Sequence, residues 1–342
     1  MKTRIGITFD LYDEYAAQGY SQLEIAEFDS EETIQNIERN LQRLGFATER
    51  VGNASKLMQA LDQGRRWDLV FNICEGLHGT GREALVPAIL DNYEIPYTFS
   101  EPLALTLSLH KDMGKRVMRD VGVQTPEFAL VEHEGDIARV DIPFPLFAKP
   151  VAEGTSKGID ASCHVQTPAE LRSTCLRLLE TCQQPVLVER YLPGREYTVG
   201  ILGSGSAAAV FGGMEIVLRE GAEPFAYTYH NKEEWETLVE FRPITPEILH
   251  ACAEISLPAW RVLSCRDAGR VDLREDADGR VHLLEVNPLP GLNEHSDLSI
   301  LSRFSGISYP QLIERIMESV LQRLDMRWPE DRQSVYARSA SA

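Results

Sequence analysis

Hydrophobic and polar residues alternate near the N-terminus with two periods, one typical of strands and the other of helices. Short apolar runs predict strands at residues 4–9 (RIGITF), 47–51 (ATERV) and 68–73 (DLVFNI). Apolar residues at helical spacing predict one helix after the capping residues Asp29 and Ser30, and a second helix over residues 54–63. Because strands and helices alternate, this region is predicted to fold as a parallel sheet covered by helices, in the α/β class.

A second unit begins near residue 101, where the pattern changes. Residues 101–122 predict two helical segments, and residues 168–182 predict an amphipathic helix between two short strands. From residue 194 onward the pattern is antiparallel and strand-rich, and it closes with a helix over residues 309–324. The remaining residues are polar and small, so a disordered tail is predicted over residues 329–342.

The composition, 43% hydrophobic and 25% charged over 342 residues, is that of a globular protein with two or three packed units. The net charge of −18 argues against a nucleic-acid partner, because a phosphate backbone repels such a surface. No apolar run is long enough to span a bilayer, so a cytoplasmic protein without a membrane partner is expected. The six cysteines are scattered without a CxxC pair, and reduced, buried thiols are expected.

Two further segments limit the alternatives. The first strand is followed by TFDLYDEY (8–15) and lacks a GxGxxG fingerprint, which argues against an NAD-dependent oxidoreductase. The acidic stretch QLEIAEFDSEE (22–32) is predicted to be the solvated start of a helix, and a surface for a partner is the alternative.

The sequence RVDLREDADGRVHLLEVN, from Arg270 to Asn287, predicts a β-hairpin with residues 278–279 as a two-residue turn. This register pairs Arg270 with Asn287 and Asp272 with Glu285. Side chains alternate along a strand, so these four residues share one polar face. The opposite, core-facing set consists of Val271, Leu273, Leu284 and Val286. A four-residue turn keeps both faces, whereas a three-residue turn keeps them only if a bulge restores the register.

The polar face of this hairpin combines three oxygen donors with one guanidinium. Carboxylate and amide oxygens are the hard ligands that bind Mg²⁺ beside substrate phosphates. A solvated outer face with cross-strand ion pairs is the alternative, because antiparallel sheets often have one wet face. The turn-rich loop NPLPGLNEHSD (287–297) follows directly and favours a metal site formed by Asp272, Glu285 and Asn287.

Lysines and a glycine-containing loop indicate an anion site. Lys149 ends a buried strand, where a charge needs a partner. The loop EGTSKG (153–158) can present backbone N–H groups and hydroxyls to a phosphate, with an ordinary surface turn as the alternative. Lys111, Glu189 and Glu196 are weak signals singly. Their order along the chain, ending in the hairpin, indicates a nucleotide site.

These segments resemble the ATP-grasp enzymes, and most closely the D-alanine–D-alanine ligases, between about residues 75 and 297. The similar motifs are EGLHGTGRE, GVQTP, AKPVAEGTSKGI, VLVERYLPGREYTV and GRVDLREDADGRVHLLEVNPLPGLNEHSD. The resemblance implies an α/β (α+β) ATP-grasp fold with an N-terminal Rossmann-like domain (1–100), a central subdomain (101–188) and a C-terminal subdomain with the magnesium site (189–328). It implies ATP and two Mg²⁺ ions as cofactors, with Mn²⁺ able to substitute.

The resemblance also assigns site residues position by position. The ATP-binding residues of the family correspond to Lys111, Lys149, Glu189, Arg190, Tyr191, Leu192, Glu196 and Lys232, the last in a loop expected to close over the phosphates. The metal ligands correspond to Asp272, Glu285 and Asn287. The catalytic residues correspond to Arg270, the backbone at Gly291, Ser156 and His78. The substrate-binding residues correspond to Glu75, His78, Ser296 and Asp297, with Ser296 holding the carboxylate of the second amino acid. Taken alone, His78 indicates a buried core histidine.

The implied reaction is ATP-dependent amide or peptide bond formation between a small-molecule carboxylate and an amine through an acyl phosphate. Analogy with the family indicates a cytoplasmic homodimer. The chain departs from the family near its N-terminus, where the ligases have a glycine-rich segment whose glutamate binds the ammonium of the first D-alanine. Asp10, Asp13 and Glu14 are the candidate replacements. Two alternatives are open: a ligase for other amino acids in peptide or natural-product metabolism, and an ATP-binding regulatory module without catalysis.

Overall fold

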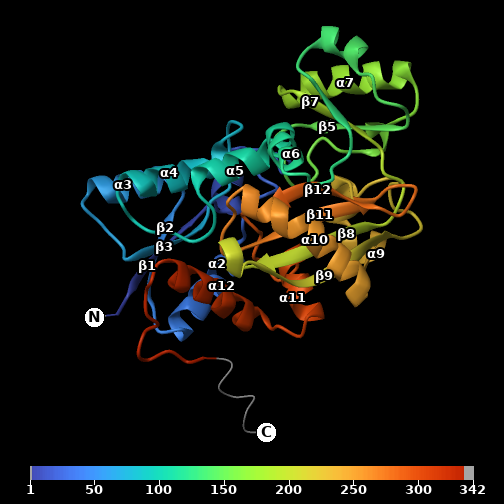
Figure 1. Cartoon of the computed structure of the whole chain (residues 1–342). Helices are drawn as coiled ribbons and strands as arrows, with labels where there is room; N and C mark the ends of the chain where they lie inside the picture. The colour runs from blue at the N-terminus through green and yellow to red at the C-terminus, as the bar shows by residue number, and fades with distance from the viewer. Residues whose placement is uncertain (1, 335–342) are drawn as a thin grey trace.

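The computed structural model describes residues 2–334, and its N-terminal part contains a parallel three-stranded sheet in the order β2-β1-β3 (Figure 1). The strands are β1 (Arg4–Phe9), β2 (Ala47–Gly52) and β3 (Leu69–Ile73). The helices around it are α1 (Tyr12–Ala16), α2 (Glu31–Arg43), α3 (Ala54–Asp62), α4 (Leu85–Asn92) and α5 (Pro102–Leu109). The cap that the sequence predicts at Ser30 is confirmed, because its side chain accepts a hydrogen bond from Thr33 N. The predicted α/β domain is therefore confirmed.

The central part of the chain forms a four-stranded sheet in the order β4-β7-β5-β6. Its strands are β4 (Phe128–Val131), β5 (Leu146–Pro150), β6 (His164–Val165) and β7 (Val186–Arg190). The amphipathic helix α7 (Pro168–Cys182) packs against this sheet, with Leu171, Cys175 and Leu178 in the shared core. Figure 1 shows this unit standing above the rest of the molecule, linked to it near α6 (Lys111–Asp120). This placement leaves one side of the central sheet facing the third sheet.

The third sheet is antiparallel, five-stranded and ordered β10-β9-β8-β11-β12. Its strands are β8 (Glu196–Leu202), β9 (Ala209–Leu218), β10 (Val239–Pro243), β11 (Ala268–Glu275) and β12 (Val281–Asn287). The helices of this part are α8 (Tyr229–Glu233), α9 (Trp235–Leu238), α10 (Pro246–Val262), α11 (Asp297–Phe304) and α12 (Tyr309–Arg323). Helix α10 buries Trp260 against the sheet. The antiparallel, strand-rich pattern predicted after residue 194 is confirmed.

The N-terminal sheet and the C-terminal helix share one hydrophobic core. Ile313 and Ile316 of α12 pack in the same buried cluster as Ile34 of α2 and Phe71 of β3. Burial of these side chains fixes the two ends of the chain against each other. The three sheets fall within the predicted ranges 1–100, 101–188 and 189–328, apart from the last residues of β7, and we propose the same division for the domains.

The turn of the β11–β12 hairpin differs from the prediction. Asp272 lies opposite Glu285 as predicted, but the register shifts after Asp272, and Leu273 then lies opposite Leu283. A three-residue turn closes the hairpin, with Asp276 N bonded to the carbonyl of Arg280. The bulge restores the predicted pairing on the polar side, yet Leu283, and not Leu284, is the fully buried core residue. The two-residue turn and the core position of Leu284 were therefore wrong predictions.

The acidic segment 22–32 is not a solvated helix start. Residues 22–27 form turns, and α2 begins only at Glu31. Ile25 is fully buried, and Glu27 forms ion pairs with Arg82 (3.0 Å) and Lys157 (2.8 Å). The segment thus folds back onto the loop that contains Lys157, because Ile25 and Phe28 are buried and the Glu27 carboxylate pairs with Lys157.

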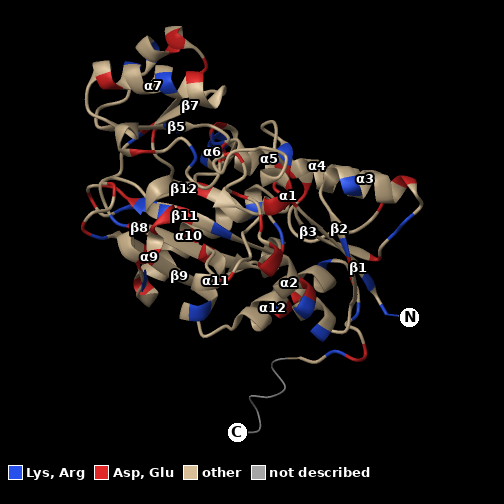
Figure 2. Cartoon of the chain, turned by 180° about the vertical axis from the view of Figure 1, so that it is seen from behind, with Lys and Arg blue, Asp and Glu red and all other residues tan. Residues whose placement is uncertain are grey.

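Near the other end of the chain, Arg332 pairs with the buried Glu314, and Gln333 N donates to Arg43 O. Residues 335–342 of the predicted tail lie outside the described residues. All six cysteines are free thiols, and Cys182 is the half-buried one among otherwise buried side chains. In the described part of the chain no helix has the length and apolarity needed to cross a membrane. Basic and acidic residues are interspersed along the chain (Figure 2).

Candidate active site

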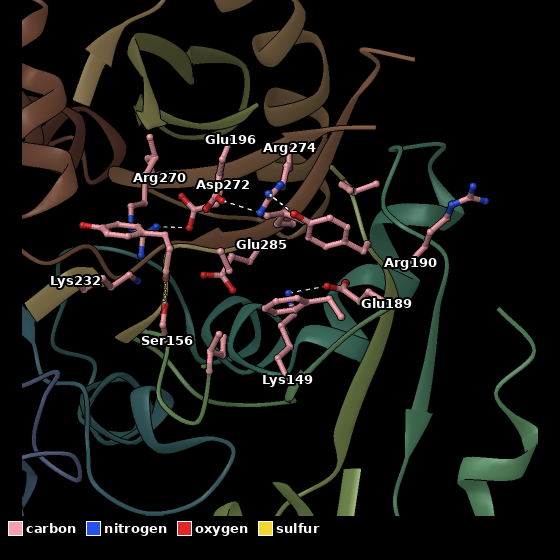
Figure 3. A pocket seen from close by; sticks show the side chains of 18 residues that line it. Lys149, Ser156, Glu189, Arg190, Glu196, Lys232, Arg270, Asp272, Arg274 and Glu285 are labelled. Atoms are coloured by element: carbon pink, nitrogen blue, oxygen red, sulfur yellow. Dashed lines mark hydrogen bonds and ion pairs between the residues drawn. The ribbon is translucent and has the colours of Figure 1, made fainter. Parts of the chain in front are cut away.

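A first cavity lies between the central and the antiparallel sheets and encloses about 750 Å³, including space open to solvent (Figure 3). Its aliphatic and phenyl lining is Phe147, Ile159, Leu192, Ile216, Ala226 and Leu284. Charged residues from β5, β7, β8, β11 and β12 line the remainder, together with Ser156 from the loop 153–158 and Lys232 from the short helix α8. An apolar slot beside clustered charges suits a ligand with a flat ring and an anionic tail.

Asp272, Glu285 and Asn287 are in contact on the polar face of the hairpin. Asn287 Nδ2 donates to Asp272 Oδ2 at 3.1 Å and to Glu285 Oε1 at 3.5 Å. The amide oxygen is the atom that binds a metal, and a 180° turn of the amide brings it to the carboxylates. Two carboxylates and an amide oxygen at this spacing fit a hard divalent cation such as Mg²⁺. The three residues could hold the metal together with substrate oxygens.

Four cationic side chains surround Glu285. Lys111 Nζ lies 3.3 Å from Glu285 Oε2 and donates to the carbonyl of Glu153 at 2.6 Å. Burial alone raises a carboxyl pKa, but the charges of Lys111, Lys149, Arg270 and Lys232 outweigh it and lower the pKa of Glu285. Glu285 is therefore a carboxylate in the folded protein, as a metal ligand must be.

The neighbouring Asp272 titrates differently. Its burial, with the negative charge of Glu285, raises its pKa to about 6 against the opposing effect of Arg270. Arg270 contacts Asp272 and also lies 3.5 Å from Asp297 Oδ2, so two carboxylates hold the guanidinium. Arg270 is thereby fixed at the junction of the hairpin and the following loop.

Glu189 is a buried carboxylate held between two lysines. Lys149 Nζ lies 2.8 Å from Glu189 Oε2, and Lys115 Nζ lies 2.7 Å from Glu189 Oε1. Burial raises the pKa of Glu189, but both lysine charges outweigh burial and lower it. Burial lowers the pKa of Lys115 to about 8. Lys149 thus has the partner that its position in a buried strand requires. Lys115 was not predicted from the sequence, although it lies one helical turn after Lys111.

The loop 153–158 and the segment before α8 lie against each other. Ser156 Oγ donates a hydrogen bond to the carbonyl oxygen of Tyr227 at 2.8 Å, and Lys232 Nζ lies 5.0 Å from the centre of the Tyr227 ring. Burial, with the charge of Arg270, lowers the pKa of Lys232. The two loops therefore close one side of the first cavity, with the Lys232 ammonium on the inside.

Glu196 is bound by Arg274, a residue that was not predicted from the sequence. Arg274 Nη1 donates to Glu196 Oε2 at 3.0 Å and to the carbonyl of Phe225 at 2.7 Å, and Nη2 donates to Tyr191 Oη at 3.1 Å. Arg274 continues the alternation of Arg270 and Asp272 on β11, which is the signal that could have found it. The side chain of Arg190 is exposed and points away from the cavity (Figure 3).

A second, larger cavity of about 1510 Å³, again including open space, adjoins the first. Both cavities share Tyr227, Lys232, Arg270 and Glu285 in their walls. The second cavity is also lined by five residues predicted from the sequence to be at the site: Glu75, Asn287, Gly291, Ser296 and Asp297. Ser296 precedes α11, and its hydroxyl donates to the carbonyl of Asn293 at 2.8 Å. Predicted residues far apart in the chain thus meet in one wall.

His78 is outside both cavities. It is exposed, and its ring centre lies 6.4 Å from that of Tyr20. It is therefore not a core histidine, and its catalytic assignment stays a prediction. Asp10 is buried and accepts hydrogen bonds from Tyr15 Oη and Gly76 N, and Asp13 and Glu14 do not line either cavity.

The three sheets and this arrangement of lysines, carboxylates and loops define an ATP-grasp fold. Two solved structures have the same fold. A D-alanine–D-alanine ligase from Bacillus anthracis with ATP has a TM-score of 0.71 and 23% identity, covering 94% of this chain and 99% of that chain. The VanG D-Ala:D-Ser ligase from Enterococcus faecalis has a TM-score of 0.72 and 20% identity, covering 94% of this chain and 100% of that chain.

The family follows from the sequence comparisons. A family profile described as "D-ala D-ala ligase C-terminus" matches residues 117–318. The D-alanine–D-alanine ligase of Aquifex aeolicus is 35% identical over 244 residues, covering 70% of this chain and 79% of that protein. The chain belongs to the D-alanine–D-alanine ligase family, and it is an ATP-dependent carbon–nitrogen ligase.

Proposed function

We propose that this ligase joins two amino acids, phosphorylating the carboxylate of the first with ATP and transferring the acyl group to the amine of the second. The observation that supports this best is the shared wall of the two cavities. Arg270, Lys232 and Glu285 face both, so a nucleotide in the first cavity and an acid in the second would meet beside the same charges.

In the first step, an oxygen of the acid carboxylate attacks the γ-phosphorus of ATP. The bond from that phosphorus to the bridging oxygen of ADP breaks, and an acyl phosphate forms. Lys111, Lys149 and Lys232 are assigned to neutralise the charge on the phosphates. Glu196 is assigned to the ribose, and residues 189–192, at the end of β7 and just after it, are assigned to the base. The loop contact between Ser156 and Tyr227 would exclude water that would otherwise hydrolyse the acyl phosphate.

In the second step, the amine of the second amino acid attacks the acyl carbon, a proton leaves the nitrogen and inorganic phosphate departs. The Arg270 guanidinium, oriented by Asp272 and Asp297, and the backbone N–H at Gly291 are assigned to the oxyanion that develops on the acyl oxygen. Ser296 is assigned to the carboxylate of the second amino acid. Both assignments are supported by the position of these residues in the wall of the second cavity.

The proposed metal ligands are Asp272, Glu285 and Asn287. They would hold two Mg²⁺ ions, and Mn²⁺ could replace Mg²⁺. When bound, the metal would supply positive charge to the phosphates. The contact among these three side chains and the ionised state of Glu285 support the assignment. We also propose a cytoplasmic enzyme and, by analogy with the family, a homodimer.

The substrates themselves form a separate part of the proposal. D-Alanyl-D-alanine synthesis is the nearest reference reaction, because curated relatives carry that name. The N-terminal segment, however, carries Glu27 and Asp29 beside the second cavity. These carboxylates stand where the family's glycine-rich segment with its substrate-binding glutamate is missing. The difference supports a ligase that takes another amino acid as its first substrate.

The test measures ADP and phosphate release from Mg·ATP with D- and L-amino acids, singly and in pairs, with mass spectrometry of the products. A pair that stimulates ADP release and yields its dipeptide establishes ligation. Nucleotide binding without stimulation by any amino acid or other carboxylate would instead favour the regulatory module without catalysis.

A further inference from the structure

Three carboxylates on the N-terminal side of the second cavity have no cationic partner. Asp29, Glu75 and Glu83 line this cavity, and within residues 2–334 none of their carboxylates makes an ion pair or a hydrogen bond. Glu83 is only 8% exposed, so bulk water does not solvate its charge well. An unpaired buried carboxylate costs several kcal/mol. Glu83 together with the half-buried Asp29 and Glu75 in one wall indicates a ligand that supplies positive charge.

Most other acidic residues of the cavity are paired with cations, Glu153 with Lys157 at 3.8 Å among them, and Glu233 of α8 is exposed to solvent. Glu27 is paired with Arg82 and Lys157, and Glu285 is paired with Lys111. Asp297 lies 3.5 Å from Arg270 Nε. The unpaired carboxylates that are shielded from solvent therefore lie at the end of the cavity that segment 22–32 and the residues after β3 build.

In the absence of a cation, protons compensate this charge. Burial, with the charge of Asp10, raises the pKa of Asp29 to about 7. Burial raises the pKa of Glu83 to about 8, with Arg82 and Lys111 opposing and Glu27 and Glu285 adding to the shift. The pKa of Glu75 is raised well above its ordinary value by burial and by the charges of Glu83, Glu27 and Asp29. A bound cation would displace protons from these groups.

The geometry favours an organic cation over a metal ion. Among residues 2–334, no group of three or more His, Cys, Asp or Glu side chains converges closely enough to hold a metal. The three carboxylates line the same cavity without converging on one point, which suits positive groups separated by a short carbon chain. An ammonium group donates three hydrogen bonds and can bridge neighbouring carboxylates.

We propose that the acid substrate of this ligase is an amino acid whose side chain carries a second positive charge, and that Asp29, Glu75 and Glu83 bind its two cationic groups. The inference rests on the proposed function, since it takes the phosphorylated acid to lie in the second cavity beside Arg270. The three carboxylates carry three negative charges, which two ammonium groups and one retained proton balance. With the single ammonium of alanine and the same retained proton, one negative charge stays unbalanced.

Three acids with the same four-carbon skeleton test the proposal: butyrate, 2-aminobutyrate and 2,4-diaminobutyrate, the last two in D and L forms. Their binding to the full chain with Mg²⁺ and a non-hydrolysable ATP analogue is measured by calorimetry. One enantiomer of 2,4-diaminobutyrate is expected to bind at least about tenfold more tightly than 2-aminobutyrate, and butyrate most weakly. Equal or weaker binding of the diamino acid overturns the proposal.

Isosteric variants then assign the effect to the carboxylates. Asp29→Asn and Glu75→Gln are expected to reduce the preference for the diamino acid to less than about threefold, while Glu24→Gln, on the exposed part of the same segment, keeps the wild-type preference. These amides remove like charges from a buried cluster, so folding is expected to survive, and thermal unfolding verifies it. Glu83→Gln is the third variant. If all three variants keep the wild-type preference for the diamino acid, the assignment of that preference to these carboxylates is overturned.

A hydroxylamine trap for the acyl phosphate separates this inference from the proposed function. Hydroxamate formed equally well from 2-aminobutyrate and 2,4-diaminobutyrate supports the ligase and overturns the dicationic subsite. Preferential binding of the diamino acid without hydroxamate from any acid supports the subsite and overturns the proposed phosphorylation.

Discussion

Ser156 Oγ donates a 2.8 Å hydrogen bond to the carbonyl oxygen of Tyr227, and this contact joins the loop 153–158 to the segment before α8. Thr155 and Ser156 both have positive φ, 48° and 57°, a conformation that costs a non-glycine residue of order 1–3 kcal/mol. The surrounding contacts must therefore hold the loop in place. Arg274 reinforces the closure from the other side through the carbonyl of Phe225.

Ser156→Ala is expected to weaken this closure. Loss of one hydrogen bond of about 1 kcal/mol reduces the ratio of closed to open loop roughly fivefold. Water then reaches the acyl phosphate, so phosphate release should exceed dipeptide formation more than it does in the wild type. The ratio of phosphate to dipeptide measures this. Ser173→Ala, which removes an exposed hydroxyl on α7, is the control, and an unchanged ratio in Ser156→Ala would contradict the closing role.

Glu285→Ala should abolish turnover without unfolding the protein. The variant loses a proposed metal ligand and leaves Lys111 without its carboxylate partner, so ADP release is expected to fall by at least about a hundredfold. Its thermal midpoint should stay within a few degrees of the wild type, because a half-buried side chain at the cavity is lost and no core is disturbed. Glu32→Ala, on the exposed side of α2, should behave as the wild type. Near wild-type ADP release by Glu285→Ala would remove it from the metal site.

Ser296→Ala should raise KM for the amine substrate, by about five- to tenfold, while KM for ATP changes little. Ser296 lines the second cavity and does not line the first. Ser296 also donates a hydrogen bond to Asn293 O, so the control variant must remove another side-chain hydrogen bond to that carbonyl. Ser299→Ala does so, because Ser299 Oγ donates to that carbonyl at 2.7 Å. Equal effects of the two variants would assign Ser296 to the loop alone.

The buried Glu83 should make stability fall with pH. Its folded pKa of about 8 lies above the ordinary value of 4.5, so its contribution to stability is fully present below about pH 4.5 and is lost as pH rises through about 8. Glu83→Gln lacks this loss. The thermal midpoint of the variant relative to the wild type is expected to rise by a few degrees between pH 5 and pH 9, since a shift of one unit is worth about 1.4 kcal/mol. If the difference in thermal midpoint between the variant and the wild type did not change with pH, Glu83 would not be a buried, unpaired carboxyl group with a raised pKa.

The polar face of the hairpin illustrates how far periodicity alone reaches. Alternation along two strands predicted that Arg270, Asp272, Glu285 and Asn287 share a face, and the structure pairs them as predicted. The turn length was wrong, because a bulge after Asp272 compensates for one extra residue in the turn. Such a bulge depends on contacts with other segments, here the bond from Leu283 N to Gln124 O, which the local pattern does not contain.

The sequence by itself determined the order of the elements and which residue types were available at the hairpin and the loops, because periodicity and turn chemistry are local properties of the chain. Only the tertiary structure decided which carboxylates are neutralised. Glu27 meets Arg82, 55 residues away, and Lys157, 130 residues away, whereas Asp29, two positions further along, meets no cation among the described residues. Charge compensation inside a protein depends on distances across the fold, and these are set by how whole elements pack.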